Sequence, residues 1–445
     1  MRIRLALSLL LAACSLRMAP AQDLVTMDQA VRYGLRHNLD LRASDQQLRA
    51  ARARVGVAKS GRYPQINARY LVQNSDNPLD VFAGKLNTRS VDPATDFTAG
   101  ALNNPGASTV NTTEIALQMP IYTGGKLGAA VRNARYHEQA VDFNLGRLRQ
   151  ETIFQIMRAY LAAQATVHGR EIADDAVVAA RGHVETTRRL VREGRIVVSD
   201  RMTAELNLAA VESARAKADD RVHLALDQLK LAMGMPVDDP IALLPWREPA
   251  VEPLDPLPVL EQRALAARKD LEAARSMVSA SAASIDEAHA AFKPQVSLVA
   301  TSDWYSHHLG FAANSQSIMG VVSINLFSGN RDTSELDDAR DRKTESELRA
   351  LNLQQDILNQ VRAAYYGVRE AMARRRIAAA NVARARQTVR LVKKRYGEGR
   401  TILLDVLNAE QLLVEARNEK LASSLDLATN QAALALAEGT LAPPQ

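Results

Sequence analysis

Few residues of this chain have types and spacings that could support chemistry. His307 and His308 are adjacent and could ligate a metal, but no further ligands accompany them at metal-site spacing, so a solvated loop pair is the better interpretation. The sequence contains no evident Ser-His-Asp set, phosphate loop or pair of converging carboxylates. We therefore predict no catalytic residue, no cofactor, no metal site and no enzyme activity.

The best functional candidates lie in two related segments, Glu193-Gly-Arg-Ile-Val-Val-Ser-Asp200 and Glu398-Gly-Arg-Thr-Ile-Leu-Leu-Asp405. Glycine permits a tight backbone turn at the second position of each segment. We expect two helical hairpin tips, which are formed by Gly194, Arg195, Ile196, Val197, Gly399, Arg400, Thr401 and Ile402.

The two aspartates that end these segments have two possible roles. In an oligomer, Asp405, and Asp200 with it, could form a pore-lining acidic ring that favours cations. Alternatively, each carboxylate stabilises the N-terminus of the following helix by about 0.3–1 kcal/mol. Both interpretations remain open.

These candidates belong to a duplicated unit. Residues 120–234 correspond to 325–439 at a shift of 205, and Asp40-Leu41 corresponds to Asp270-Leu271 at a shift of 230. The first copy thus contains 25 more residues between positions 65 and 120. An internal repeat predicts an architecture built by repetition.

The N-terminus is typical of an exported protein. A basic start and the apolar run Leu5 to Ala13 form a secretory signal, and we expect a signal peptide over 1–21 with cleavage after Ala21. The alternative is lipidation at Cys14, which is also the only cysteine. Removal of 1–21 leaves 53 basic and 50 acidic residues, so the charge does not indicate a nucleic-acid partner.

Hydrophobic periodicity predicts a mainly α chain in which each copy contains a helix, a strand pair, a long helix and a return helix. Thr26 and Gln29 form a possible capping box, and Ile153, Ile156 and Tyr160 have the spacing of a packing seam. The copies are expected over 22–234 and 259–439, joined by a Pro-rich linker over 235–258 and followed by a tail over 440–445. The expected helices are 28–60, 126–192, 200–233, 259–291, 331–397 and 405–438, and the expected strands are 65–74, 112–121, 295–304 and 317–326.

The strands are the expected membrane elements. Beyond the signal, no apolar run reaches the roughly 20 residues that a membrane helix needs. Four strands cannot close a barrel, and open edges leave backbone groups unsatisfied in lipid. Three copies would supply twelve strands and twelve helical columns, so we expect a trimer with a small membrane β-barrel joined to an α-helical tube.

The chain resembles the TolC-like outer-membrane efflux protein (OEP) family from Leu24 to Thr440. The resemblance rests on the two tip segments and on further paired motifs: Asn38-Leu-Asp-Leu41, Lys269-Asp-Leu271, Tyr63-Pro-Gln65, Lys293-Pro-Gln295, Pro120-Ile-Tyr-Thr-Gly-Gly125 and Asn325-Leu-Phe-Ser-Gly-Asn330. It implies a homotrimeric exit duct in the Gram-negative outer membrane that extends into the periplasm. It also implies two partners, a periplasmic membrane-fusion (adaptor) protein and an inner-membrane pump or ABC transporter. The same resemblance implies that the residues of the two hairpin tips contact the adaptor protein.

Two alternatives concern function. A soluble periplasmic coiled-coil scaffold or adaptor protein also contains helical hairpins, although it would not need two strand pairs that each lead into a 67-residue helix. Within the duct interpretation, efflux of drugs, metals or other small molecules and type I protein secretion all fit, because substrate choice lies mostly in the pump.

Overall fold

The computed structural model describes residues 24–251 and 253–443, so the expected signal peptide, with Cys14 and Ala21, lies outside the described residues. The expected mainly helical, duplicated architecture is confirmed. No helix in the described part combines the length and apolar character needed to cross a membrane.

The chain forms two compact units. The helical unit takes its described residues from 1–39, 149–260 and 361–445, and the sheet unit comprises 40–148 and 261–360. Each unit therefore draws on both sequence repeats, and the compact units do not coincide with the repeats.

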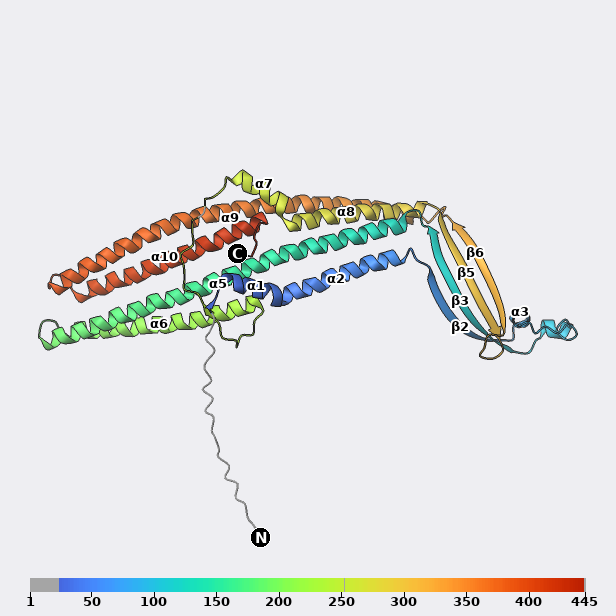
Figure 1. Cartoon of the computed structure of the whole chain (residues 1–445), viewed down its shortest axis with the longest axis horizontal. Coiled ribbons are helices and arrows are strands. Elements are labelled where there is room, and N and C mark those ends of the chain that lie inside the picture. The colour runs from blue at the N-terminus through green and yellow to red at the C-terminus, as the bar shows by residue number, and fades with distance from the viewer. Residues whose placement is uncertain (1–23, 252, 444–445) are drawn as a thin grey trace, which may run out of the picture. The chain divides into compact units, whose positions relative to one another are not determined.

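The helical unit is built mainly from long helices (Figure 1). It contains the C-terminal parts of α5 and α9, both of which continue from the sheet unit, and a short parallel bridge between β1 and β4. Its elements are β1 (Leu24–Val25), α1 (Met27–His37), α6 (Val198–Met233), β4 (Ala242–Leu243) and α10 (Leu403–Glu438), with parts of α5 (Lys126–Arg192) and α9 (Arg331–Gly397). The helix α7 (Leu257–Ala267) begins in this unit and continues from Glu261 in the sheet unit.

The core of the helical unit lies where α1, α5 and α6 meet. Ile153, Ile156 and Tyr160, the predicted seam of α5, are at most 4% exposed, and burying each such side chain stabilises the fold by about 1.5–3 kcal/mol. The Tyr160 hydroxyl donates a 2.8 Å hydrogen bond to the Val25 carbonyl, which satisfies its buried polar end. The predicted capping box between Thr26 and Gln29 at the start of α1 is also confirmed.

The Pro-rich segment before α7 is tied to the long helices of the same unit. Glu248 accepts a 3.2 Å hydrogen bond from Arg375 and a shorter one from Lys420. The hydrogen bond from Lys420, assisted by Arg375, outweighs burial and holds the pKa of Glu248 below its usual value. The Gln164 amide donates a 2.8 Å hydrogen bond to the Leu244 carbonyl. The segment is therefore a strap held by these side-chain contacts together with the short bridge between β1 and β4.

The sheet unit contains one antiparallel sheet of order β2-β3-β5-β6, seen at the end of the helices in Figure 1. The strand pair of each repeat is thus hydrogen-bonded to that of the other through β3 and β5. The elements of this unit are α2 (Leu39–Ser60), β2 (Gln65–Ser75), α3 (Pro78–Asn87), α4 (Ala99–Asn103), β3 (Ser108–Tyr122), α8 (Lys269–His289), η1 (Ala290–Phe292), β5 (Gln295–Ser306) and β6 (Ala313–Ser323).

Both opening helices are interrupted where the sequence predicted continuous helices over 28–60 and 259–291. The breaks fall at Asn38 and Arg268, which are equivalent positions of the two repeats. Each has an extended ψ, 127° at Asn38 and 117° at Arg268. The Asn38 amide donates to the Ala232 carbonyl at 3.2 Å, and the Arg268 guanidinium, 2% exposed, bonds Asp270 and Gln360 at 2.9 Å each. Partners distant in sequence hold each break, so helical periodicity did not reveal it.

Two further differences concern the loops and strands. The segment between the expected strands 65–74 and 112–121, for which no element was predicted, contains α3 and α4. The helix α3 begins with the helix-start signals Asn77 as N-cap and Pro78 as first residue. The last strand, expected over 317–326, instead begins at Ala313 and ends at Ser323. The cross-strand pairing that sets these bounds starts at Tyr305 opposite Ala313.

Candidate functional site at the hairpin tips

The first predicted tip connects α5 to α6. Gly194 adopts a left-handed conformation with φ 66°, and its amide donates to the Val191 carbonyl at 3.0 Å. The next amide, that of Arg195, reaches back to the Leu190 carbonyl at 2.9 Å. These two bonds satisfy carbonyl groups at the end of α5, as expected for a helix that ends in a left-handed glycine.

The second tip, between α9 and α10, repeats this geometry. Gly399 has φ 70°, its amide donates to the Tyr396 carbonyl at 3.0 Å, and the Arg400 amide donates to the Arg395 carbonyl at 2.8 Å. A Cβ added at Gly194 or Gly399 would meet no atom within 4 Å. The backbone conformation, not lack of space, therefore requires glycine at both tips.

The tips present apolar and basic side chains to solvent. Val197 and Ile402 are each 63% exposed and precede the first residue of the return helices. The side chains of Arg195 and Arg400 are 62% and 75% exposed, and among the described residues each forms an ion pair only with a glutamate of its own turn, at 3.6 and 3.1 Å. Ile196 and Thr401 are partly buried. Such exposed ion pairs contribute little to stability, which leaves both arginines available for a partner.

A small apolar cluster lies directly behind the tips. Val184, Ala204, Leu403 and Leu407 are each at most 7% exposed, and Tyr396 packs against them. The cluster contains side chains from both hairpins, so the two tips are packed together within the helical unit.

Asp200 and Asp405 have different surroundings although they occupy equivalent positions. Asp405 is exposed, and its carboxylate accepts a short hydrogen bond from the Thr401 hydroxyl. Asp200 is partly buried and lies near Tyr396, whose hydroxyl is buried without a hydrogen-bond partner in the described structure. Burial, together with the charge of Asp200, raises the pKa of Tyr396. The backbone amides of Asp200 and Asp405 each donate a hydrogen bond to the carbonyl three residues earlier, as expected at a helix start.

One polar contact between the hairpins was not predicted from the sequence. Glu410 of α10 bonds the His183 Nε2 of α5 at 2.7 Å through one carboxylate oxygen and the Lys393 ammonium of α9 at 2.6 Å through the other. The equivalent Glu205 instead pairs with Arg188 at 3.3 Å. Repetition of the glutamate was visible in the sequence, but its partners differ between the copies, and only the packed structure identifies them.

The environment of Glu410 favours its charged form. Burial acts to raise the pKa of this carboxyl, but the hydrogen bonds from His183 and Lys393 outweigh it, so the pKa of Glu410 lies below its usual value. The side chain of Glu410 is 17% exposed, and that of His183 is 13% exposed. This trio therefore links three helices through one partly buried charge.

A groove runs along the helices behind the tips. It has a volume of about 1080 Å³ and is lined by α5, α6, α9 and α10, and ten of its lining residues are alanine. Lys393 and Glu410 also line it. Small side chains permit close approach of another helix, so this groove fits the apolar face of an amphipathic helix.

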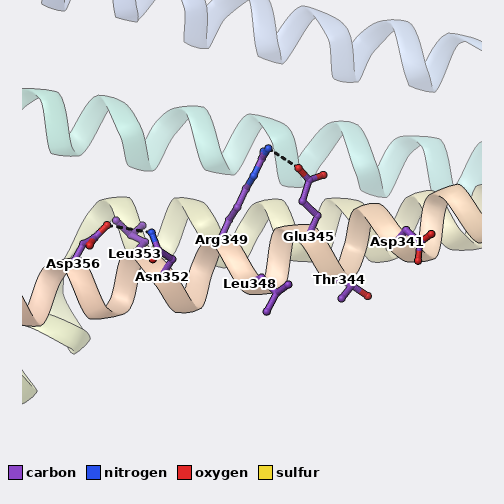
Figure 2. A pocket seen from close by; sticks show the side chains of 8 residues that line it. All are labelled: Asp341, Thr344, Glu345, Leu348, Arg349, Asn352, Leu353 and Asp356. Atoms are coloured by element: carbon purple, nitrogen blue, oxygen red, sulfur yellow. Dashed lines mark hydrogen bonds and ion pairs between the residues drawn. The ribbon is translucent and has the colours of Figure 1, made fainter.

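The sheet unit contains a shallower hollow along α9, shown in Figure 2. All its lining side chains come from this one helix, and several pair along the helix, such as Arg349 with Glu345 at 2.5 Å and Asn352 with Asp356 at 3.4 Å. Leu348 in the middle of the hollow is 62% exposed. The hollow is an unpartnered helix face rather than a ligand pocket.

We expect Glu410→Gln to lower the stability of the protein in a pH-dependent way. A carboxylate whose folded-state pKa is depressed stabilises the fold above its unfolded pKa of about 4.3, and this contribution is lost as pH falls through the folded-state pKa. The difference between wild type and variant should be about 1–3 kcal/mol at neutral pH and should shrink below about pH 4. Thermal unfolding followed by circular dichroism across pH checks this. An equal difference at every pH would mean that the variant acts through packing alone.

The comparisons with known proteins agree on one family. The family model "Outer membrane efflux protein" matches residues 33–235 and 260–440. The alkaline protease secretion protein AprF of Pseudomonas aeruginosa is 26% identical over 345 residues, which cover 74% of this chain and 69% of AprF.

Solved structures have the same fold. A crystal structure of CusC superimposes with a TM-score of 0.79 at 19% identity, covering 94% of this chain and 93% of CusC. The Campylobacter jejuni outer membrane channel CmeC also has a TM-score of 0.79, at 16% identity, covering 93% of this chain and 85% of CmeC. Because the family model matches most of the chain, the protein belongs to the outer membrane efflux protein family, the non-enzymatic channels of the Gram-negative outer membrane that extend into the periplasm and serve tripartite efflux or type I secretion.

Proposed function

We propose that three copies of this chain form a passive exit duct, a twelve-strand β-barrel joined to a twelve-column helical tube. The observation that carries this proposal is the pair of unpaired edges of the sheet. β2 and β6 are the outer strands, and neither has a strand partner on its outer side in the described structure. In a membrane such edges must be paired, and a closed ring of identical copies pairs every edge.

The two faces of the sheet support the same assembly. Alternate residues of the edge strands are apolar and largely exposed, with Ile66 67%, Val72 57%, Ile318 78% and Val322 70% exposed. The strand register puts all four on one face, because directly opposed residues of paired strands point to the same side. An apolar outer face with a polar inner face is the pattern of a strand that spans a bilayer.

A helix face without a packing partner in the described structure also supports contact with a neighbouring copy of the chain. The face of α9 in Figure 2 exposes Leu348 between charged residues. A helix face of this kind is suited to packing against another helix. We propose that a helix of the next copy covers it in the trimer.

The tips are the proposed contact with a periplasmic adaptor protein, through which an inner-membrane pump or ABC transporter delivers the substrate. Among the tip residues, Val197 and Ile402 offer exposed apolar side chains and Arg195 and Arg400 exposed basic ones, and the alanine-lined groove behind them could accept an adaptor helix. The similarity to AprF, a secretion protein, supports a type I secretion system as the setting of this duct. A soluble scaffold is the less favoured alternative, because it would leave the apolar face of the sheet in water.

The mass of the detergent-extracted outer-membrane protein tests the assembly. Light scattering, corrected for bound detergent, should give about three times the mass of the mature chain, because three copies supply the twelve strands of the proposed barrel, a number within the range of known membrane barrels. A folded monomer, or a protein that stays in solution without detergent, would favour the scaffold instead.

Charge reversal at the second tip tests the adaptor contact. We expect Arg400→Glu to abolish export while trimers remain in the outer membrane, because the side chain is exposed and has no role in the fold beyond its turn. The matched control is Arg32→Glu in α1, an exposed arginine that also pairs with an acidic residue of its own local segment, and this variant should leave export intact. Export, adaptor co-purification and trimer abundance are measured together. Loss of trimers in Arg400→Glu would identify the tip as a folding element.

Asp405→Ala separates a pore-lining charge from a structural one when it is compared with Thr401→Ala. Both variants remove the Thr401–Asp405 hydrogen bond, but only the first removes the charge. If Asp405 contributes to an acidic ring at the entrance, Asp405→Ala alone raises the conductance of the idle channel in planar bilayers. Equal conductance in both variants and wild type would leave only stabilisation of the start of α10.

A further inference from the structure

The four long strands contain only three charged residues, Arg69 in β2, Glu114 in β3 and Asp303 in β5. The strand register brings these residues together although they are far apart in sequence. Arg69 pairs with Glu114, Glu114 with Asp303, and Asp303 with Ser315 of β6. Directly opposed residues point to the same side of a sheet. All charges of the strands therefore form a single row across one face, which we call the charge row.

The charge row has an acidic excess. The Arg69 guanidinium donates to the Glu114 carboxylate at 2.6 Å, so these two charges largely offset each other. Asp303 has no hydrogen-bond or ion-pair partner among the residues that the structure describes. The row thus carries one net negative charge for each copy of the chain, and that charge resides at Asp303.

The charge row lies on the polar face of the sheet. Its neighbours along the strands on this face include Asn67, Gln73, Thr112, Gln118 and Thr301, whereas the opposite face contains the exposed apolar residues described above. In the proposed duct the apolar face contacts lipid and the polar face lines the lumen. This placement rests on the proposed function.

The insert between β2 and β3 packs against the same face. A Cβ on Gly84 of α3 would lie 2.8 Å from a methyl group of Val110, which shares its face with Glu114 about 13 Å farther along β3. Asp80 of α3 accepts a 3.2 Å hydrogen bond from Gln73 on this face. Arg89 donates at 3.1 Å to the carbonyl of Asn314, next to Ser315. Asp80 and Arg89 offset each other in charge, as do Lys85 and Asp96, which form an ion pair. Asp76 and Asp92 leave the insert acidic, so it adds to the negative charge of Asp303 rather than cancelling it.

We propose that the charge row is a cation-selective filter of the duct and that Asp303 is its specificity-determining residue. Rings of acidic side chains favour cations in channels. Three copies place three uncompensated carboxylates at one level of the lumen, where α3 brings the insert onto the same wall. The filter attracts cations and repels anions over a distance set by ionic screening.

Reversal potentials of purified wild-type protein in planar bilayers test this filter. Under a gradient of KCl, the wild type should be selective for K⁺. Selectivity should be stronger at about 0.1 M than at about 1 M salt, because the Debye length falls from about 10 Å to about 3 Å. Asp303→Asn should shift the reversal potential towards zero, and Asp303→Lys should shift it further in the direction of anion selectivity.

Two variants serve as matched controls. Asp303→Glu keeps the charge and should keep the selectivity of the wild type. The double variant Asp303→Asn with Ser315→Asp moves the carboxylate to the adjacent strand in the same row and should restore the selectivity that Asp303→Asn loses.

Different results would refute the duct and the filter. If the wild type forms no conducting trimer, the proposed duct is wrong and the filter falls with it. If the wild type conducts and Asp303→Asn and Asp303→Lys leave its reversal potential unchanged, the duct stands and the filter is refuted. Restoration by the double variant would exclude a local effect of position 303 on folding as the cause.

Discussion

The requirement that every backbone N–H and C=O find a partner is the constraint on which the rest of this structure depends. The long helices satisfy it internally, and at their ends left-handed glycines such as Gly194 and Gly399 return amides to the last carbonyls. The four-stranded sheet cannot satisfy it alone, because its edges at β2 and β6 stay unpaired. In the proposed duct, association between copies pairs these edges.

The two sequence repeats form hairpins of the same backbone geometry, but the polar contacts of their side chains differ. The tips share the same turn, yet Asp405 is exposed beside Thr401 while the equivalent Asp200 lies near Tyr396 of the other hairpin. Glu410 holds His183 and Lys393, whereas the equivalent Glu205 holds Arg188. Such polar contacts are weak individually, but a partly buried charge that is bonded to two helices is costly to separate from them. The two hairpins therefore differ in the contacts of a few polar side chains, whereas their turns are the same.

Regular periodicity accounts for most of what could be predicted. The seam through Ile153, Ile156 and Tyr160 is buried as its spacing indicated, and both 67-residue helices have the lengths that the repeat implied. Prediction failed where long-range contacts override a local pattern. Arg268 interrupts an otherwise helical segment because its guanidinium is buried against Asp270 and Gln360, and β6 begins at Ala313 because pairing with β5 sets its limits.

By itself, the sequence determined the family, the duplicated order of elements and the positions of the hairpin tips, because these follow from local motifs and from the periods of helices and strands. Only the tertiary structure decided which distant residues meet. The row formed by Arg69, Glu114 and Asp303 depends on the register of three strands from both repeats, and a slip by one residue would move each side chain to the other face. Register is a property of paired strands, and no single segment encodes it.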